Sequence, residues 1–138
     1  MNALDSSVLV AALVDSEPRH KVCGALLDRS DACVYSHAIT ETFNTLTGGR
    51  SGYRISAAQV AELIDASILP CVQVVVLSAR DLMTAIREAD SRGVRGAAIF
   101  DYLHFASARK ARANRLYTLD AGDFKAFHRK GEPEIVEP

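Results

Sequence analysis

The stretch GAAIFDYLHFASARKA, residues 96–111, decides the fold because it combines a strong helix signal with one acid in a run that is otherwise small or apolar. Good helix formers without proline predict a helix that begins near Ala98 and carries Asp101 in its first turn. His104 and Phe105 follow three and four residues on, on the face of Asp101. Small residues let such a helix pack close to a sheet, where an inward carboxylate needs a partner. The alternative role for Asp101 is to complement the positive end of the helix dipole.

Two short apolar runs elsewhere in the chain are each followed by an acidic residue. Residues 1–4 lead into Asp5, and residues 116–119 lead into Asp120, with Asp123 in the turn beyond. We interpret both runs as strands. The two acids then stand at the carboxyl ends of strands.

The rest of the chain alternates helical and strand-like segments. The further expected strands are residues 32–35, residues 72–77 with their run of valines, and Ile135–Val136 as an edge strand. The further expected helices are residues 8–14 behind the candidate caps Ser6 and Ser7, residues 19–29, residues 37–47 between Ser36 and the pair Gly48–Gly49, and two that open at Ser56 and Ser78 and run to about residues 67 and 91. Glu41 lies within the third of these helices, and its spacing from the apolar residues leaves its exposure open.

Strands separated by helical segments predict a parallel sheet with helices on both faces. A chain of 138 residues is the size of one such domain, so we expect a single α/β domain over residues 1–138. Ligands of these sheets bind beyond the carboxyl ends of the strands. Because Asp5 and Asp120 sit at strand ends and the helices of Glu41 and Asp101 begin just past two strands, four acids are expected to converge at that edge.

Composition limits where the protein acts and what attracts it. The net charge of -1 predicts no general attraction to polyanions, so binding of nucleic acid would need local clusters of positive charge. Three scattered cysteines without a CxxC spacing suit a reducing cytosol better than a disulfide framework. No secretory signal and no membrane-spanning apolar run are visible, and we expect a cytoplasmic protein without membrane contact.

Each acid also has an ordinary role when it is taken alone. Asp5 is a possible helix cap, Asp120 and Asp123 are possible turn residues, and Glu41 suits a solvated helix face. Brought together, however, carboxylates repel and raise one another's pKa unless a cation lies among them. Oxygen-only ligands select hard cations, so Mg²⁺, or Mn²⁺ in its place, is the expected metal.

Other catalytic patterns find little support. The HExxH motif is absent, so His37 and His104 are better interpreted as surface or packing histidines than as ligands of a transition metal. The chain also lacks the GxSxG, GxxxxGK[ST] and GxGxxG motifs. A cluster of carboxylates holding Mg²⁺ can activate water for attack on a phosphodiester, which makes nucleic acid the expected substrate.

A basic segment late in the chain provides the positive charge that such a substrate needs. Lysines and arginines outnumber Asp120 and Asp123 between residues 109 and 130. If the helix of Asp101 continues, Arg109, Arg112 and Arg115 share one face and can contact a phosphate backbone together. The alternatives are a solvated helix face or a surface for a protein partner.

Three blocks of the sequence together resemble one family, the PIN-domain ribonucleases, and within it the VapC toxins of type II toxin–antitoxin modules. The blocks are LDSSVLVAAL at residues 4–13, SHAITETFNTLTG at residues 36–48 and IFDYLHFASARKARANRLYTLDAGDF at residues 99–124. The resemblance covers the whole chain in order and implies a PIN-like fold, a short parallel sheet flanked by helices.

The resemblance also implies roles for individual residues. The acids of the family fall on Asp5, Glu41, Asp101 and Asp120, with Asp123 as a fifth candidate, and Thr118 matches a hydroxyl that supports the acid cluster. It implies a Mg²⁺-dependent endoribonuclease that cleaves structured RNA such as tRNA or rRNA. The implied partners are a second copy of the chain and a cognate VapB-like antitoxin.

Two other classes of protein remain open. A Mg²⁺-dependent phosphatase or phosphotransfer domain would show a DxD pair after the first strand or a lysine after a late one, whereas this chain has Asp5-Ser6-Ser7. A nucleic-acid-binding module that has lost catalysis would show a gap in the acid set, and none is visible.

Overall fold

Five short strands form one parallel sheet at the centre of the computed structural model, which describes residues 1–138. The strands lie in the order β3-β2-β1-β4-β5, and every neighbouring pair is parallel. Their bounds are β1 Asn2–Leu4, β2 Ala32–Tyr35, β3 Val72–Val75, β4 Arg115–Tyr117 and β5 Glu134–Val136. Parallel pairing brings all the carboxyl ends of the strands to one edge of the sheet, and the predicted α/β class is confirmed.

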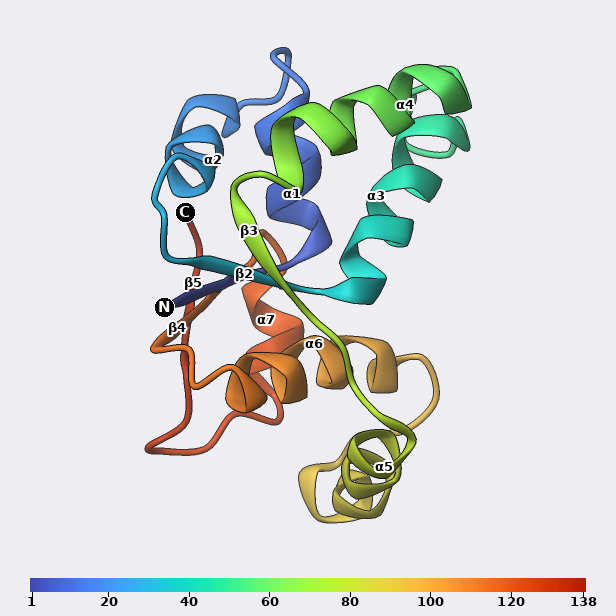
Figure 1. Cartoon of the computed structure of the whole chain (residues 1–138). Coiled ribbons are helices and arrows are strands. Elements are labelled where there is room, and N and C mark those ends of the chain that lie inside the picture. Colours follow the sequence, from blue (N-terminus) through green and yellow to red (C-terminus); the bar gives the residue numbers. More distant parts are fainter.

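Helices cover both faces of this sheet (Figure 1). On one side lie α1 Ser6–Leu13, α2 His20–Leu27, α3 Ser36–Thr47, α4 Ala57–Leu63 and the π-helix Ile64–Ile68 that continues α4. On the other side lie α5 Ala79–Arg92, α6 Ala98–Lys110 and α7 Ala121–Lys125. None of these helices combines the length and the apolar character that a membrane crossing requires.

The core is split by the sheet because successive side chains of a strand point to opposite faces. Leu4 and Tyr117 pack into the cluster beneath α1 to α4, whereas Ala3 and Leu116, their neighbours on the same two strands, pack into the cluster beneath α6 and α7. The aromatic side chain of Phe105 is fully buried in the second cluster. The small residues of α6 therefore do what the sequence predicted, which is to bring this helix close against the sheet.

The order of the strands and of the longer helices agrees with the sequence, but the short helix α7, which carries Asp123, lies where a turn was expected. The other disagreements concern the ends of elements. The caps Ser56 and Ser78 are confirmed, because each forms a capping box at the start of its helix. The capping role predicted for Ser6 and Ser7 is wrong. Asp5 is the N-cap of α1, and its side chain accepts a hydrogen bond from the amide of Val8.

Two further differences are shifts of one or two residues. Ser36 is the first residue of α3 and not its cap, because the extended residue before the helix is Tyr35. The strand expected over residues 72–77 ends at Val75 and lies at the edge of the sheet. Val75 of this strand is buried, whereas Val74 and the next residue beyond the strand, Val76, are exposed.

The prediction that Arg109, Arg112 and Arg115 share a helical face is wrong. Helix α6 ends at Lys110, and Arg112 has a φ of 55°, a left-handed conformation that turns the chain away from the helix. Arg115 begins β4 and pairs in register with Asn2, at the amino edge of the sheet. Arg109 and Arg112 still line one cavity, but no helical face joins them to Arg115. The contact of the three side chains with RNA therefore stays a prediction without that geometric support.

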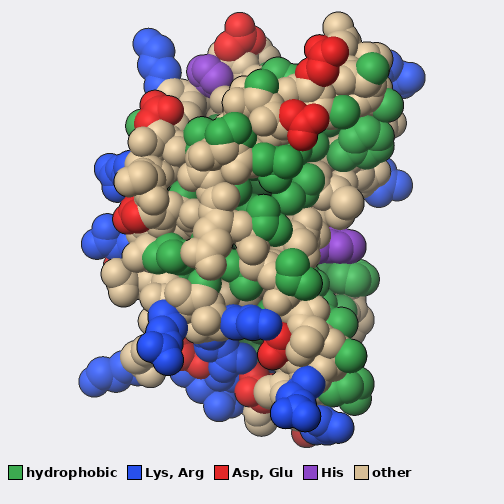
Figure 2. Space-filling view, viewed as in Figure 1, with side chains coloured by type: hydrophobic (Ala, Val, Ile, Leu, Met, Phe, Trp, Pro, Cys, Tyr) green, Lys and Arg blue, Asp and Glu red, His purple; other side chains and the backbone are tan.

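Acids from other segments also compensate much of the basic segment. Arg109 forms ion pairs with Glu88 and Glu132, and Arg115 forms one with Glu134. Figure 2 shows lysine and arginine side chains gathered at the lower end of the molecule, around α5, with acids among them. The segment is therefore a mixed-charge surface and not a continuous positive one.

Helix α6 offers a matched pair of substitutions that tests this account of the core. Phe105 is fully buried and Phe100 is 55% exposed on the same helix. We expect Phe105→Ala to lower the free energy of unfolding by about 3–5 kcal/mol, because it leaves a cavity in a packed cluster. Phe100→Ala should change it by less than about 0.5 kcal/mol. Urea unfolding of the two variants measures both values, and equal losses would contradict the core described here.

Candidate active site

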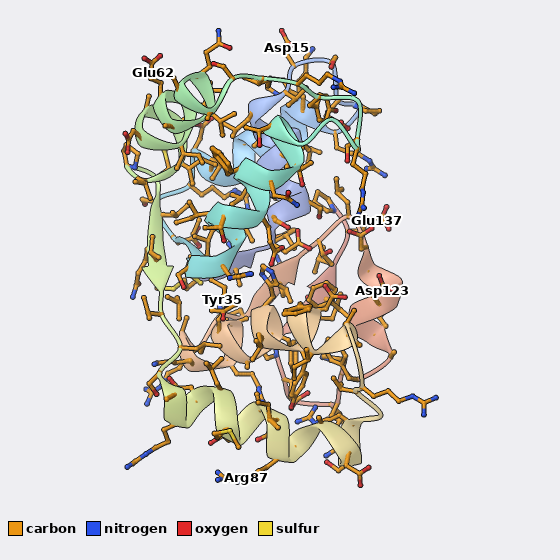
Figure 3. All side chains as sticks on the ribbon, turned by 90° about the vertical axis from the view of Figure 1, so that its right-hand side faces the viewer. Asp15, Tyr35, Glu62, Arg87, Asp123 and Glu137 are labelled. Carbon is orange, nitrogen blue, oxygen red and sulfur yellow. The ribbon has the colours of Figure 1, made fainter.

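Five carboxylates come to the carboxyl edge of the sheet from four parts of the chain. They are Asp5 after β1, Glu41 on α3, Asp101 on α6, and Asp120 and Asp123 at the start of α7. Figure 3 looks onto this edge, with α3 above, α6 below, Tyr35 of β2 between them and Asp123 beside them. The sequence predicted this meeting of acids from strand ends and helix starts.

Pairing of β1 with β4 places the two strand-end acids side by side. Leu4 lies opposite Tyr117 in the register, and the amide of Asp5 donates to the carbonyl oxygen of Tyr117 at 3.1 Å. Asp5 therefore follows its strand at the level of Thr118, and Asp120 lies two residues farther along the neighbouring segment. Their positions result from backbone hydrogen bonds and not from contacts of their side chains.

Asp5 is buried, with 5% of its surface exposed, and its carboxylate is held by hydrogen bonds. The hydroxyl of Ser7 donates to Oδ1 at 2.5 Å, and the amide of Val8 donates to the same oxygen at 3.2 Å. Ser7 also accepts a hydrogen bond from the amide of Leu119 at 2.9 Å, which ties Asp5 to the segment that carries Asp120. Burial raises the pKa of Asp5 against the lowering effect of these donors. The residue is both a helix cap and a member of the cluster.

Glu41 is oriented by two donors from different helices. Its Oε2 accepts from the hydroxyl of Ser6 at 2.8 Å, and its Oε1 accepts from Nε2 of His104 at 2.9 Å. Burial would raise the pKa of Glu41, but the hydrogen bonds and the charge of His104 outweigh it, so this pKa lies below its usual value. The carboxylate is thus kept ionised in one orientation.

His104 contacts the acid cluster, which the sequence interpretation did not predict. It is 3% exposed, and its ring packs edge-on against Tyr35. Its position three residues after Asp101 had placed it on the inward face of α6, but its partner Glu41 lies on another helix, 63 residues away in the chain. Only the tertiary structure, which brings Glu41 of α3 within hydrogen-bond distance of α6, shows that this histidine lies at the acid cluster.

Asp101 is the acid whose chemistry the fold changes most. Burial, together with the charges of Asp123, Asp5 and Glu41, raises its pKa to about 6, and His104 offsets part of this effect. The carboxylate accepts no hydrogen bond within the protein. A neighbouring cation would strongly stabilise the ionised form of a carboxyl group that has a raised pKa and no hydrogen-bond donor.

Asp120, the residue before α7, and Asp123, in the first turn of that helix, are exposed to solvent. Thr118 is fully buried, and its hydroxyl accepts a hydrogen bond from the amide of Asp120 at 3.0 Å. The same hydroxyl helps to lower the pKa of Asp5. The carboxylates of Asp120 and Asp123 are exposed and form no hydrogen bond, but Asp123 is the one whose charge raises the pKa of Asp101. The hydroxyl of Thr118 thus contacts the segment that carries Asp120, and its support of the acid cluster stays a prediction.

The donor set is suited to a hard cation, although the side chains as they lie do not enclose one. No lysine or arginine forms an ion pair with any of the five acids. No three histidine, cysteine, aspartate or glutamate side chains lie close enough together to bind a metal as they stand. Because Asp101, Asp120 and Asp123 have no internal hydrogen bonds, their carboxylates can turn toward a cation without breaking a contact.

Comparison with known proteins identifies the fold and its relatives. A model of the PIN domain matches residues 3–130. The crystal structure of VapC20 from Mycobacterium tuberculosis, described as a toxin that cleaves the sarcin–ricin loop, superposes with a TM-score of 0.70 and 24% identity over 96% of this chain and 100% of that one. VapBC2 from Rickettsia felis, bound to a promoter DNA fragment, gives a TM-score of 0.69 and 15% identity over 99% of this chain and 98% of that one.

A third similar structure belongs to the same group. It is the DNA-bound VapBC of Salmonella typhimurium, with a TM-score of 0.64 and 14% identity over 99% of this chain and 96% of that one. Comparison with curated protein sequences gave no match. At these identities the similar structures support the fold, and the role of each acid in this chain has to be argued from its own geometry.

The raised pKa of Asp101 predicts a pH dependence of stability in protein kept free of metal with EDTA. The folded protein holds the Asp101 proton up to a pH of about 6, whereas the ordinary value is 3.8, so this residue costs no stability below pH 4 and a growing amount as the pH rises through 6. Asp101→Asn removes the charge and should be more stable than the wild type at pH 7, by about 1 kcal/mol once solvent screening of a half-exposed group is allowed for.

Thermal unfolding between pH 4 and pH 8 measures the effect. The difference in melting temperature between Asp101→Asn and wild type should be close to zero at pH 4 and reach its plateau above pH 6. Asp65→Asn, at an exposed acid of the π-helix outside the site, is the control. Parallel pH profiles for Asp101→Asn and wild type would show that the fold does not strain this carboxylate.

Proposed function

Because the chain belongs to the PIN-domain family, we propose that it is a divalent-metal-dependent endoribonuclease, acting as the toxin of a VapBC-type toxin–antitoxin module. The substrate is structured RNA, of which tRNA and rRNA are the leading candidates. The bond hydrolysed is a phosphodiester, and the protein acts in the cytoplasm.

One observation supports this proposal above all others. Five carboxylates meet at the carboxyl edge of the sheet without a lysine or arginine among them, and burial together with the charges of Asp123, Asp5 and Glu41 raises the pKa of Asp101 to about 6. Such crowding destabilises the folded protein unless a cation binds there. A fold that retains this destabilising group of carboxylates does so because the carboxylates serve a function.

Mg²⁺ is the cation that this donor set fits best, with Mn²⁺ as a substitute. Asp5, Glu41, Asp101 and one or both of Asp120 and Asp123 would hold it. When bound, the ion activates a water molecule and neutralises charge on the phosphate and the leaving oxygen. Zinc is a poorer match because the four acids offer neither thiolate nor imidazole.

The protein's own residues keep the ligands in place. Ser7 orients Asp5 and links it to Leu119 in the segment before Asp120. Ser6 and His104 hold Glu41 from opposite helices. Two of the carboxylates are therefore fixed in advance, while those of Asp101, Asp120 and Asp123 are free to adjust to a metal and a substrate.

The proposed partners follow from the similar structures and from the surface. The solved structures of R. felis and S. typhimurium contain VapBC assemblies, which supports a VapB-like antitoxin as the cognate inhibitor of this chain. A homodimer is also proposed, because Met83, Ile86 and Phe100 expose apolar surface on α5 and α6. Sedimentation of the protein alone tests that assembly.

A phosphotransfer enzyme fits the same edge less well. That chemistry would place a second acid at position 7, where this chain has a serine whose hydroxyl is committed to Asp5 and Leu119. A module that binds without cleaving would have no use for a strained, unpaired Asp101. Both alternatives make the same forecast, which is that the purified protein does not cut RNA.

Removal of single metal-binding charges tests the proposal. We expect Asp5→Asn and Asp101→Asn each to abolish cleavage of a total tRNA and rRNA mixture in the presence of Mg²⁺, because each removes a ligand charge at constant volume. Sequencing of the 5′ ends that form gives both the rate and the cleavage sites. Wild-type rates in either variant would refute the carboxylate site.

Metal binding is measured separately from cleavage. Mg²⁺ or Mn²⁺ should raise the melting temperature of the wild type and raise that of Asp101→Asn much less, because only the folded wild type offers the full ligand set. Zn²⁺ should not support cleavage. Equal shifts in the two proteins would mean that the ions bind elsewhere.

His104 should act as a positioning residue for Glu41. His104→Leu removes the donor and is expected to lower cleavage and Mn²⁺ affinity by about 10- to 100-fold, the usual cost of losing a group that orients a metal ligand. His104→Gln keeps an N–H donor at similar reach and should restore most of both. If the two variants lose activity and Mn²⁺ affinity equally, the Nε2 hydrogen bond to Glu41 has no special role.

A further inference from the structure

A cavity of about 340 Å³ opens directly beside the acid cluster. Its walls come from α1 and α3, which pack side by side (Figure 1), and from the segment between α3 and α4. Ser6 and Asp120 line it and also belong to the cluster or its immediate support. Any group bound in this cavity therefore lies next to the metal-binding acids.

Two hydroxyl groups of this cavity, those of Thr45 and Ser51, form no hydrogen bond in the protein, and Thr45 is the half-buried one while Ser51 is exposed. Helix α3 contains four threonines, and the hydroxyls of Thr40, Thr42 and Thr47 each donate to a backbone carbonyl of the preceding turn. The hydroxyl of Thr45 forms no hydrogen bond in the protein and lines the cavity instead. Thr45 also follows Glu41 by four residues, so it lies one helical turn from the cluster on the same face.

The rest of the lining is neutral or negative, which excludes a phosphate as the occupant. The cavity contains no lysine or arginine, and its charged residues are Glu17 and Asp120. The carboxylate of Glu17 accepts a hydrogen bond from the hydroxyl of Tyr53, and both residues line the cavity wall. An anion would be repelled here, whereas a flat group with polar edges is not.

The combination of an aromatic ring, a free hydroxyl and apolar walls has a known use in recognition of RNA. Unstacked bases of single-stranded segments bind by stacking on aromatic side chains and by hydrogen bonds along their edges. A cavity at the small end of the range for ligand pockets, about 300–1,000 Å³, suits one base and not a folded partner. Tyr53 and Thr45 supply the ring and the hydroxyl.

We propose that this cavity binds a single nucleobase of the RNA, next to the bond that is cleaved, and that Thr45 and Tyr53 select it. The inference rests on the proposed ribonuclease function and adds to it a site for base selection. The acids and their metal would position the phosphate, and the cavity would select the base.

The experiment uses an RNA library with a randomised single-stranded segment, cleaved by wild type and variants and read by sequencing of the 5′ ends. Thr45→Val replaces the hydroxyl by a methyl group of the same shape and should reduce the preference at one position beside the cut by about two- to tenfold. Tyr53→Leu removes the ring and should raise KM by about fivefold or more, with kcat nearly unchanged, because the base binds equally in ground and transition states.

Matched controls separate base recognition from general damage. Thr47→Val lies on the same helix, and its hydroxyl is already bonded to the carbonyl of Phe43, so the profile should not change. Tyr53→Phe keeps the ring and should keep KM near the wild-type value. The melting temperature of each variant in the presence of Mn²⁺ reports whether fold and metal site survive.

The outcomes distinguish this inference from the proposed function on which it rests. If wild type cleaves RNA with Mg²⁺ but Thr45→Val and Tyr53→Leu leave the profile and KM unchanged, the cavity is not a base site, and a side chain of a protein partner becomes its occupant. If Tyr53→Phe raises KM as much as Tyr53→Leu, stacking on the ring is wrong. If wild type cleaves no RNA, the proposed function fails and the base site fails with it.

Discussion

Parallel pairing of β1 with β4 is the interaction on which the candidate site depends. The two strands are three residues long, yet the hydrogen bond from the amide of Asp5 to the carbonyl of Tyr117 brings two segments more than a hundred residues apart to the same level. The bond from the amide of Leu119 to the hydroxyl of Ser7 continues this contact beyond the strands. A slip of one residue in this pairing would move Asp5 away from Asp120 and turn the strand's core side chains to the wrong face.

The acids that meet at this edge destabilise the folded protein. Hydrogen bonds from the rest of the protein compensate the charge of some of these acids and not of others. Asp5 and Glu41 receive hydrogen bonds from Ser7, Val8, Ser6 and His104, so their charges are partly compensated. Asp101 receives none, and its pKa is raised first by burial and further by the charges of Asp123, Asp5 and Glu41. This division between fixed and strained carboxylates is what a site needs if part of it must be ready in advance and part must respond to a ligand.

Positive charge is used elsewhere for a structural purpose. Arg92 is largely buried and binds Glu132 at 2.5 Å through Nη2, and its Nη1 donates to the carbonyl of Phe127. Arg109 joins the same network through Glu88 and Glu132. These contacts fasten the segment before β5 to α5 and α6, and they explain why an arginine-rich stretch in a protein of net charge -1 does not form an open basic surface.

The sequence by itself determined the class of fold and the identity of the acids, because both depend on local signals. Each of these signals depends on only a few neighbouring residues. Examples are the apolar runs that end in Asp5 and Asp120, the small residues after Asp101, and the capping serines Ser56 and Ser78. What only the tertiary structure decided is which side chains partner one another. The bond between His104 and Glu41 joins α6 to α3, the free hydroxyl of Thr45 meets Tyr53 in a shared cavity, and Arg115 stands in a strand at the far edge from the acids. These relations depend on where helices end and on how they pack. The periodicity of the sequence predicts neither the left-handed conformation of Arg112 nor the contact between residues of two different helices.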